Sequence, residues 1–596
     1  MRTLRPSTIC QGLAIVTILT AAAFCTSHRV VAQSGPARLG LPQDWSHRHV
    51  VFSSTQDIPL LIKVRQDPRV LHQWLRHNPL LASHANVTPI QQPPGEFQTA
   101  EPASEIDGAV ASERGVDWSV SLGGVNSILP RNQYPAKYSF DVNAPPDCVN
   151  DYVVFPTNRV GAFNQATIVA FNNLYSTQNG VLPAGLCGSN GPSVKWSYNT
   201  GGLIRSSPLL SLDGTKVAWV SRINGIVHVL TIGTTGSNGT SVTAPAVPGT
   251  GNNAVDKRVT LNGGPRVTQS SLFVDYFNDV GYVGDDRGVL HKITGVFNGT
   301  PAEVTTGGWP VPVSAAAATL NAPTFDSVSK NIFVTDGSGH LSYVQDVGST
   351  TGTCVISGAP PCLGFPVIAV SSGSAIMDSP GLDPVTGRVF TETAASGTNA
   401  QIVQTDTALG NVVRVNVGQQ DAAHPLHSGG VDINYLNNVS TGFYYVCGKA
   451  PGNMNPTLYR IGFNAAGVMN SAPDAARLRL ARAAAECSPI TTIFNTGSIP
   501  QKDWLFVGVS TRCGNIPVFP GGCAMSYDIT NGIPTVLTAA VAERNGTSGI
   551  IIDNVSTAAQ ASNIYFTNEG TAPAAQPCGD GLAGGCAVKL TQSGLK

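Results

Sequence analysis

Residues Ile204 to Leu230 read IRSSPLLSLDGTKVAWVSRINGIVHVL, and this stretch decides the fold. A short run opens at Ser206-Ser207-Pro208 and ends at the turn Asp213-Gly214. A β-rich run from Lys216 to Ser221 follows, and a turn at Asn224-Gly225 leads into a third run. Asp-Gly and Asn-Gly pairs supply the positive φ angles that tight hairpins require. The stretch therefore predicts a three-stranded antiparallel meander.

A fourth strand is expected from Val194 to Tyr198, and four antiparallel strands make one blade of a β-propeller. The opening of this unit recurs at intervals of about 50 to 64 residues. Seven starts align on it, and an eighth, weaker start lies at Lys137 to Val142. The seven are SSPLLSLD at Ser206, SSLFVD at Ser270, NAPTFD at Asn321, DSPGLD at Asp378, SGGVD at Ser428, CSPITTIFN at Cys487 and TSGIIID at Thr547.

A β-rich second strand follows each start, so we expect an all-β fold with a single closed propeller of eight blades over residues 116–596. Closure is predicted because Asp117 to Val120 (DWSV) matches the fourth-strand pattern of Lys195 to Tyr198 (KWSY) and could complete the last blade. A closed ring removes the free sheet edges that promote aggregation. Seven blades are the alternative, since the first start lacks the Ser-Pro signature.

The segment WSYNTGGLIRSSPLLSLDGTKVAWV, Trp196 to Val220, resembles the repeat of the quinoprotein-like, or PQQ-repeat, eight-bladed propellers. The chain is also similar to exported bacterial propeller proteins. The resemblance implies a propeller from about Val116 to Leu590. Quinone-cofactor dehydrogenases of this fold carry a vicinal Cys-Cys pair and a tryptophan docking motif in most blades. The sequence has neither, so no cofactor is expected.

The first 32 residues have the pattern of an export signal, with Arg2 and Arg5 before an apolar stretch from Gly12 to Phe24. Cleavage is expected near Val30-Val31-Ala32, and lipid attachment at Cys25 is the alternative. We therefore expect a secreted, periplasmic or cell-surface protein. No later segment has 18 consecutive apolar residues, so no membrane span is expected.

Residues 40–87 are expected to form a small α/β module, followed by a flexible linker over residues 88–115. Asp67 as N-cap and Pro68 at the first helical position predict a helix. Its apolar face would be Val70, Leu71, Trp74 and Leu75, which either docks on the propeller or binds a partner. Six histidines between His28 and His84 fit no metal motif, and we expect them on a solvated surface.

Ten cysteines remain after the export signal, an even number that favours disulfides in an oxidising compartment. The simplest connectivity joins neighbours in the sequence, with free thiols as the alternative. The expected pairs are Cys148 with Cys187, Cys354 with Cys362, Cys447 with Cys487, Cys513 with Cys523, and Cys578 with Cys586.

Charged residues make up only 12% of the chain and the net charge is -1, which excludes an electrostatic case for nucleic acid. No metalloprotease, nucleotide-loop, nucleophile-elbow, calcium-loop or haem motif occurs, and no metal site is expected. His228 and His291 occupy matching places in their third strands, which indicates a shared, outward structural position.

A functional site, if present, is expected at the channel mouth where the inner strands begin, because loops from all blades converge there. The candidate ligand-binding residues at these starts are Arg205, Gln269, Asn321, Asp378, His424 and His427. Asp378 is the only carboxylate in the ring of starting residues, and Asp421, His424 and His427 lie in DAAHPLH before a neighbouring inner strand. A carboxylate that faces two imidazoles could orient a base or hold a polar ligand. Alternatively, these groups satisfy channel waters and strand ends.

Two functions remain. The first is an exported propeller that binds a small molecule, glycan or surface protein without catalysis. The second is a propeller enzyme, either an oxidoreductase or a lyase or hydrolase acting on carbohydrate or peptide. The absence of a catalytic motif favours the first, and fold alone cannot separate them.

Overall fold

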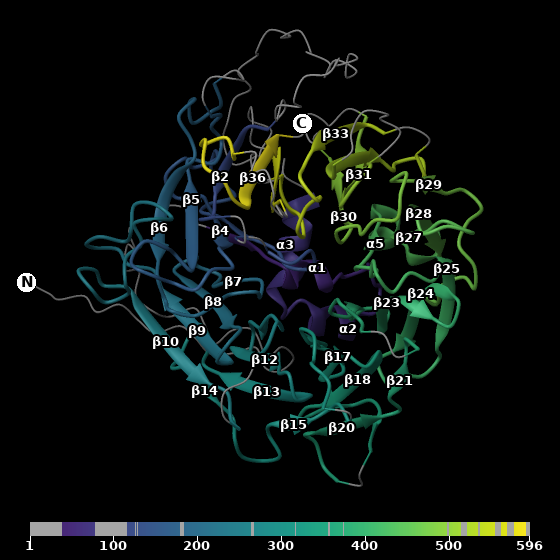
Figure 1. Ribbon diagram of the computed structural model, residues 1–596. Coiled ribbons are helices and arrows are strands. Elements are labelled where there is room, and N and C mark those ends of the chain that lie inside the picture. The colour runs from purple at the N-terminus through teal and green to yellow at the C-terminus, as the bar shows by residue number, and fades with distance from the viewer. Residues whose placement is uncertain are drawn as a thin grey trace, which may run out of the picture. The chain divides into compact units, whose positions relative to one another are not determined.

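The computed structural model describes residues 39–77 and 116–591, apart from 125–126, 128, 179–183, 264–266, 316, 356–357, 373–374, 497–499, 514–520, 535–536, 555–561 and 569–576. The export signal and the whole predicted linker, residues 88–115, lie outside these residues. Eight antiparallel sheets follow one another around a ring, as the eight-bladed prediction requires (Figure 1).

The first four blades contain the following strands, from the inside outward except where a blade carries extra short strands. They are β1 (Leu41–Gln43), β3 (Ala136–Ser139), β4 (Tyr152–Pro156), β5 (Ile168–Asn172) and β6 (Ser193–Tyr198); β7 (Leu209–Leu210), β8 (Lys216–Ser221), β9 (Ile226–Thr231) and β10 (Val255–Thr260); β11 (Phe273–Asp275), β12 (Val280–Gly284), β13 (Val289–Thr294), β14 (Ala302–Glu303) and β15 (Val311–Pro312); and β16 (Thr324–Phe325), β17 (Asn331–Thr335), β18 (His340–Gln345), β19 (Thr353–Cys354), β20 (Cys362–Phe365) and β21 (Ile368–Ala369).

The last four blades are more regular, with four strands each. They are β22 (Gly381–Asp383), β23 (Arg388–Ser396), β24 (Asn399–Asp406) and β25 (Val413–Gln419); β26 (Gly430–Val431), β27 (Phe443–Lys449), β28 (Pro456–Gly462) and β29 (Leu478–Arg479); β30 (Thr491–Asn495), β31 (Lys502–Val509), β32 (Cys523–Asp528) and β33 (Ala539–Ala542); and β34 (Ile551–Asn554), β35 (Ser562–Thr567), β36 (Cys586–Thr591) and β2 (Trp118–Ser121).

The ring is closed by the N-terminal strand β2, as the DWSV pattern predicts. Trp118 pairs with Lys589 and Ser121 with Cys586, so β2 is the outer strand of the eighth blade. The strand at Val194 to Tyr198 belongs to the first blade as β6, and the outer strand of the blade that begins at Ser206 is β10. The four strands predicted between Val194 and Leu230 therefore span the boundary between two blades.

The serines of the repeated start hold the inner strand to the second strand. The hydroxyl of Ser206 accepts a hydrogen bond from the backbone N–H of Val220. The same bond joins Ser270 to Gly284, Ser488 to Gly508 and Ser548 to Thr567. The signature is thus structural, because a short polar side chain replaces a ladder bond where the inner strand begins.

The N-terminal residues fill the channel of the ring, where the purple helices lie in the centre of the view (Figure 1). The strand β1 pairs with β3, and Val50 forms a parallel bridge with Leu382 of the fifth blade. The helices are α1 (Ser46–His49), α2 (Ile58–Val64) and α3 (Pro68–His77), and later in the chain α5 (Ile433–Asn437) and the 3-10 helix η1 (Val439–Thr441). The side chain of Trp45, 2% exposed, packs at 6.0 Å from the ring of Phe273.

The helix predicted after Asp67 is present as α3, and the face expected to be buried is half right, because Leu75 is buried and Val70 packs against the core. Leu71 and Trp74, however, are 43% and 49% exposed, and the polar residues Arg69, His72 and His77 are buried instead. Arg69 supplies the reason, since its guanidinium pairs with Asp67, donates to the carbonyl of Val274 and lies over two aromatic rings. Polar contacts to the channel wall, rather than apolar area, orient this helix.

The sequence placed the six histidines from His28 to His84 on a solvated surface, and for the four that the structure describes this is wrong. His28 and His84 lie outside the described residues. His47, His49, His72 and His77 are all buried. His47 bonds to Asp44 and His72, and His49 to the carbonyl of Trp45. The outward position expected for His228 and His291 is also wrong, because both are buried against carboxylates. In each case a hydrogen-bond partner offsets the cost of burying a polar ring.

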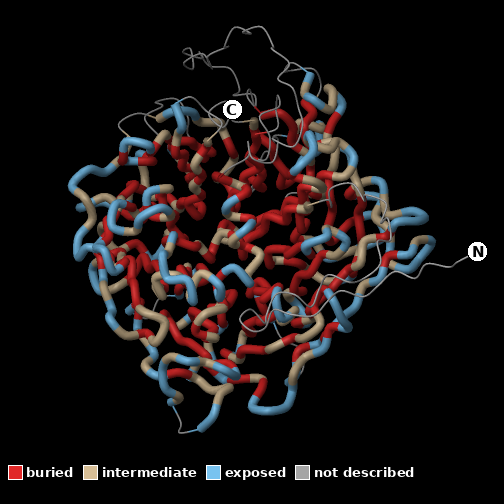
Figure 2. The backbone as a smooth tube through the Cα atoms, turned by 180° about the vertical axis from the view of Figure 1, so that it is seen from behind, coloured by how far each residue is buried: buried red, intermediate tan, exposed pale blue. Residues whose placement is uncertain are grey.

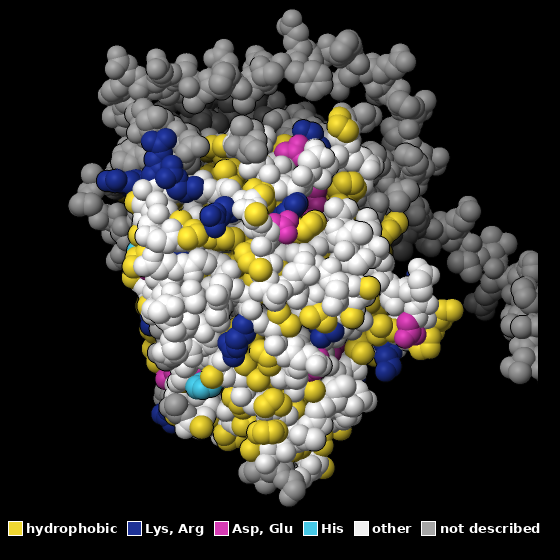
Figure 3. Space-filling model, turned by 90° about the vertical axis from the view of Figure 1, so that its right-hand side faces the viewer, with side chains coloured by type: hydrophobic (Ala, Val, Ile, Leu, Met, Phe, Trp, Pro, Cys, Tyr) yellow, Lys and Arg dark blue, Asp and Glu magenta, His cyan; other side chains and the backbone are white. Residues whose placement is uncertain are grey.

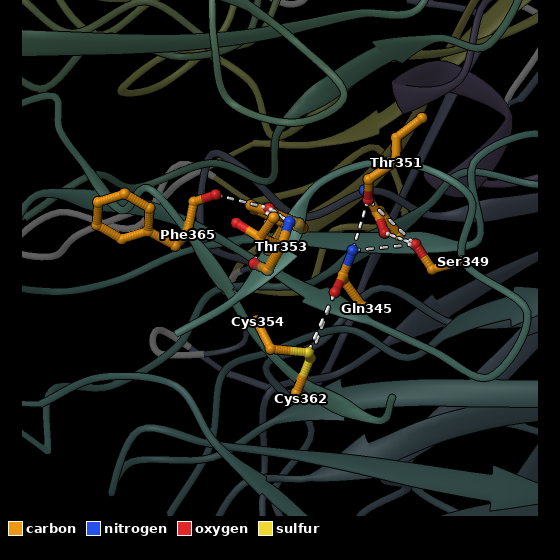
Figure 4. The surroundings of a disulfide bond; sticks show 9 residues. Gln345, Ser349, Thr351, Thr353, Cys354, Cys362 and Phe365 are labelled. Atoms are coloured by element: carbon orange, nitrogen blue, oxygen red, sulfur yellow. Dashed lines mark hydrogen bonds between the residues drawn. A yellow bond between two sulfur atoms is a disulfide. The ribbon is translucent and has the colours of Figure 1, made fainter. Parts of the chain in front are cut away.

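Four of the five expected disulfides are present: Cys148–Cys187, Cys354–Cys362, Cys447–Cys487 and Cys578–Cys586. Figure 4 shows the pair Cys354–Cys362 beside the side-chain oxygen of Gln345. The expected bond between Cys513 and Cys523 is absent, and both are buried free thiols. Burial, followed by contact with Cys513, raises the pKa of the Cys523 thiol.

Because both thiols are buried, we expect them to stay reduced after air purification. Alkylation of the residue 33–596 protein in denaturant should label two cysteines, both on the peptides that contain Cys513 and Cys523. The same treatment without denaturant should label neither. A count of zero in denaturant would show that the fifth disulfide forms.

The outer surface of the ring carries little charge. Seen from behind, buried strands make up the body of the ring and exposed segments gather at its rim (Figure 2). The side shown in Figure 3 is mostly uncharged, with scattered Lys, Arg, Asp and Glu. Among the described residues, no helix has the length and apolar character needed to cross a bilayer.

Candidate functional site

Two of the predicted site residues, Asp378 and His427, meet at the end of the channel where the inner strands begin. His427 Nδ1 lies 2.8 Å from Asp378 Oδ1, and the other carboxylate oxygen accepts from the backbone N–H of Ser428. His427 Nε2 lies 2.7 Å from Oε1 of Glu486, whose Oε2 is 3.0 Å from Nε of Arg131. An acid–imidazole–acid–guanidinium chain therefore links the connections that lead into blades five, six and seven to the segment before β3 of the first blade. We call these four residues the channel network.

The channel network keeps His427 charged. Burial alone would lower the pKa of His427, but the attraction of Asp378 and the hydrogen bonds to both carboxylates outweigh it and raise the pKa to about 10. Burial would raise the pKa of Glu486, yet its contacts with His427 and Arg131 lower it to about 2. The pKa of Asp378 is also lowered, against burial, chiefly by the charge of His427. An imidazolium held by two carboxylates has no free nitrogen for base catalysis.

The other four candidates do not join this network. Nε of Arg205 donates to Asn158, and Gln269 is exposed. The Asn321 amide donates to Thr335. His424 Nδ1 lies 2.8 Å from Asp421 Oδ2. The prediction that one carboxylate faces two imidazoles is therefore wrong. His427 pairs with Asp378, and His424 pairs with Asp421.

Sequence reasoning missed Glu486 and Arg131. Glu486 directly precedes Cys487, the seventh start, just as His427 precedes Ser428, so the alignment of starts contained a signal for it. Arg131 lies upstream of the first start, where the repeat offers no register. Its position depends on a loop that only the folded ring brings across the channel.

The loop around Arg131 closes this end of the channel. The carbonyl oxygen of Gln133 accepts from the N–H of Gly549 in the eighth blade, and its side-chain oxygen accepts from Ser207 and Ser271 in the second and third. Asn132 donates to the carbonyl of Met377. With the N-terminal module inside the ring, the channel is therefore filled by the chain itself.

Deeper in the channel, a second buried acid meets the N-terminal module. Glu392 accepts hydrogen bonds from the hydroxyl of Tyr444 and the N–H of Gly429, while Arg48 donates to the Gly429 carbonyl. Burial raises the pKa of Glu392 to about 7, with hydrogen bonding and Arg48 acting in the opposite direction. This acid belongs to the contact between module and ring.

An open groove of about 430 Å³ lies on the same face as the channel network, between the connections of blades five and six. It is lined by Thr398, Gln419, Gln420, Asp421, Ala422, Ala423 and Met454. Asp421 forms ion pairs with His424 and with Lys449 at 3.2 Å, and its Oδ1 has no hydrogen-bond partner. No cluster of three metal-binding side chains occurs in the described part of the chain.

Comparisons with known proteins identify no family. No family model matches the sequence, and no curated protein matches it. Solved propellers match in structure: Sqt1 from Chaetomium thermophilum has a TM-score of 0.46 and 10% identity, covering 81% of this chain and all of that one. BamB from Moraxella catarrhalis has a TM-score of 0.37 and 11% identity, covering 80% of this chain and 98% of that one.

The WD40 domain of Toxoplasma gondii coronin has a TM-score of 0.34 and 12% identity, covering 70% of this chain and 82% of that one. These similarities are too distant to carry an argument about function. The chain is a β-propeller by its own strand pairing.

Proposed function

We propose that this chain is an exported β-propeller that binds a polar partner, a glycan or a segment of a surface protein, in the groove between blades five and six. The observation that carries the proposal is the filled channel. Because the module and the Arg131 loop occupy the place where propeller ligands would enter, the open concave surface lies in the groove beside Asp421.

The groove has the chemistry for such a partner. Its lining is uncharged except for Asp421, and Gln419, Gln420 and Thr398 offer amide and hydroxyl groups. Met454 is 39% exposed at its rim and supplies an adaptable apolar contact. Groups of this kind suit a hydrogen-bonding partner.

Export is supported by the four disulfides, which form and persist in oxidising compartments. The resemblance to quinoprotein-like propellers is consistent with an exported protein, and we propose no cofactor. A propeller enzyme stays the alternative prediction. It is less favoured because His427, at the expected site, has both ring nitrogens engaged by Asp378 and Glu486.

Site-specific photo-crosslinking in the producing cells tests this proposal. A photoreactive residue in place of Met454 should give a discrete adduct in the fraction outside the cytoplasm. The same residue in place of Val347, 69% exposed at the opposite face of the ring, should not. Gln420→Ala should weaken the adduct at position 454. Equal adducts at both positions, or protein found only in the cytoplasm, would contradict the proposal.

A further inference from the structure

A small cavity of about 50 Å³ lies inside the ring, where the N-terminal module meets blades five, six and seven. Its wall includes Arg48 at α1, Arg76 at the end of α3, Gly430 at the start of β26, and Thr492 and Asp503 from the seventh blade. A volume of this size holds several water-sized groups, since one water needs about 10 to 15 Å³ on this measure. The cavity can therefore accommodate a small molecule.

Within the described chain, no acid forms an ion pair with either of the two arginines that face this cavity, Arg48 and Arg76, although the charge of Arg48 acts on Glu392. Nε of each is buried without a hydrogen-bond partner. Arg48 donates to the carbonyl of Gly429 and also interacts with the hydroxyl of Tyr134. Arg69 on the same helix as Arg76 shows the contrast, because it is paired with Asp67 and bonded to Val274.

The acids near the arginines offset their charge only in part, because burial raises the pKa of Glu392, on which Arg48 acts, to about 7. Burial and the charge of Arg48 lower the pKa of Arg76 to about 10, so it remains a cation at neutral pH. Burial lowers the pKa of His49 to about 4 and of His77 to about 3, which leaves both rings neutral. Asp503 is the one acid in the described lining, and burial raises its pKa to about 7.

We propose that this cavity is a binding site for a small oxyanion, held between the guanidinium groups of Arg48 and Arg76. Arg48 and Arg76 are half-buried with a buried Nε each, and a cation withdrawn from water is stabilised by a counter-charge. Guanidinium forks match the oxygens of phosphate, sulfate and carboxylate groups. Gly430 leaves the space that Arg48 occupies, because a Cβ there would lie 3.3 Å from Arg48 Nη2. The inference does not rest on the groove or on export.

Calorimetric titration with inorganic phosphate tests the site, after dialysis of the protein into a chloride buffer of constant ionic strength. The wild type should bind about one phosphate per chain, and its melting temperature should rise and then level off with concentration. Arg76→Gln should weaken binding at least tenfold. Arg65→Gln, which removes an exposed arginine on the preceding turn, should bind as the wild type does.

Titrations with sulfate and acetate in the same buffer identify which oxyanion binds best. Phosphate and sulfate also stabilise proteins in general, so a rise in melting temperature that does not level off and is equal in wild type and Arg76→Gln would overturn the proposal. Should Arg76→Gln fail to fold, the ³¹P resonance of phosphate is recorded with wild-type protein and with an excess of the Arg48→Lys variant, both exchanged into chloride buffer. Line broadening by the wild type that is absent with Arg48→Lys supports the site. No broadening by the wild type would refute it.

Discussion

His427→Ala should be among the most destabilising single substitutions in this chain, lowering the free energy of unfolding by about 3 to 5 kcal/mol. The substitution removes the cation between Asp378 and Glu486 and leaves Asp378, 4% exposed, without its counter-charge. Urea unfolding followed by tryptophan fluorescence measures the change.

His424→Ala is the matched control, because His424 is also paired with an acid but its side chain is 32% exposed. Its partner Asp421 keeps the ion pair with Lys449. We expect a loss of at most about 1 kcal/mol, as for other exposed pairs. Small, equal losses for both histidines would show that the channel network does not stabilise the ring.

The contribution of the channel network should depend on pH in a defined window. The pKa of His427 is raised from 6.5 to about 10, so its contribution is complete below about pH 6.5 and is lost as the pH rises towards 10. The pKa of Glu486 is lowered from 4.5 to about 2, so its contribution is present above about pH 4.5 and is lost towards pH 2. The difference in unfolding free energy between wild type and His427→Ala should therefore be largest between about pH 4.5 and 6.5.

The second large effect is expected from the N-terminal module. Deleting residues 39–77 removes β1 from the first blade and leaves the channel side chains of the ring exposed, so the protein should be insoluble. Trp45→Ala tests the same contact with a smaller change. We expect it to lower the free energy of unfolding by about 3 to 5 kcal/mol, because Trp45 is 2% exposed and packs in the main core cluster.

Phe163→Ala is the control for Trp45→Ala, since Phe163 is an aromatic residue that is 97% exposed. Its effect should lie within about 0.5 kcal/mol. Thermal and urea unfolding of the two variants decide the matter. A soluble, cooperatively folded ring without residues 39–77 would show that the module is an independent attachment.

The repeat made most of the ring predictable, while the channel was not. Starts such as Ser206 and Ser270 reveal the inner strands because the same cross-strand bond recurs in several blades. The closing strand was readable for the same reason, as DWSV repeats KWSY. Local pattern carries this information, since each blade is built from hairpins.

The contents of the channel depend on contacts between residues far apart in the sequence. Arg69 reaches Val274, and Arg131 reaches Glu486, so no window of the sequence contains both partners. The buried face of α3 was predicted only in part, because beside Leu75 it carries Arg69 and His72, which composition assigns to solvent. Likewise, the network around His427 was half predicted, since Asp378 and His427 share the repeat but Arg131 does not.

The closing strand also fixes an order of assembly. Trp118 finds its partner Lys589 only when almost the whole chain exists, so the edge of the eighth blade must wait while the other blades form. At typical rates of synthesis, that interval is roughly half a minute to a minute and a half. The first strand β1, in contrast, can pair with β3 as soon as Ser139 emerges. Pairing of a nascent chain can therefore begin at the channel, between β1 and β3, and ends with the pairing of β2 and β36. A stalled chain that lacks β36 would leave an unpaired strand edge in every copy.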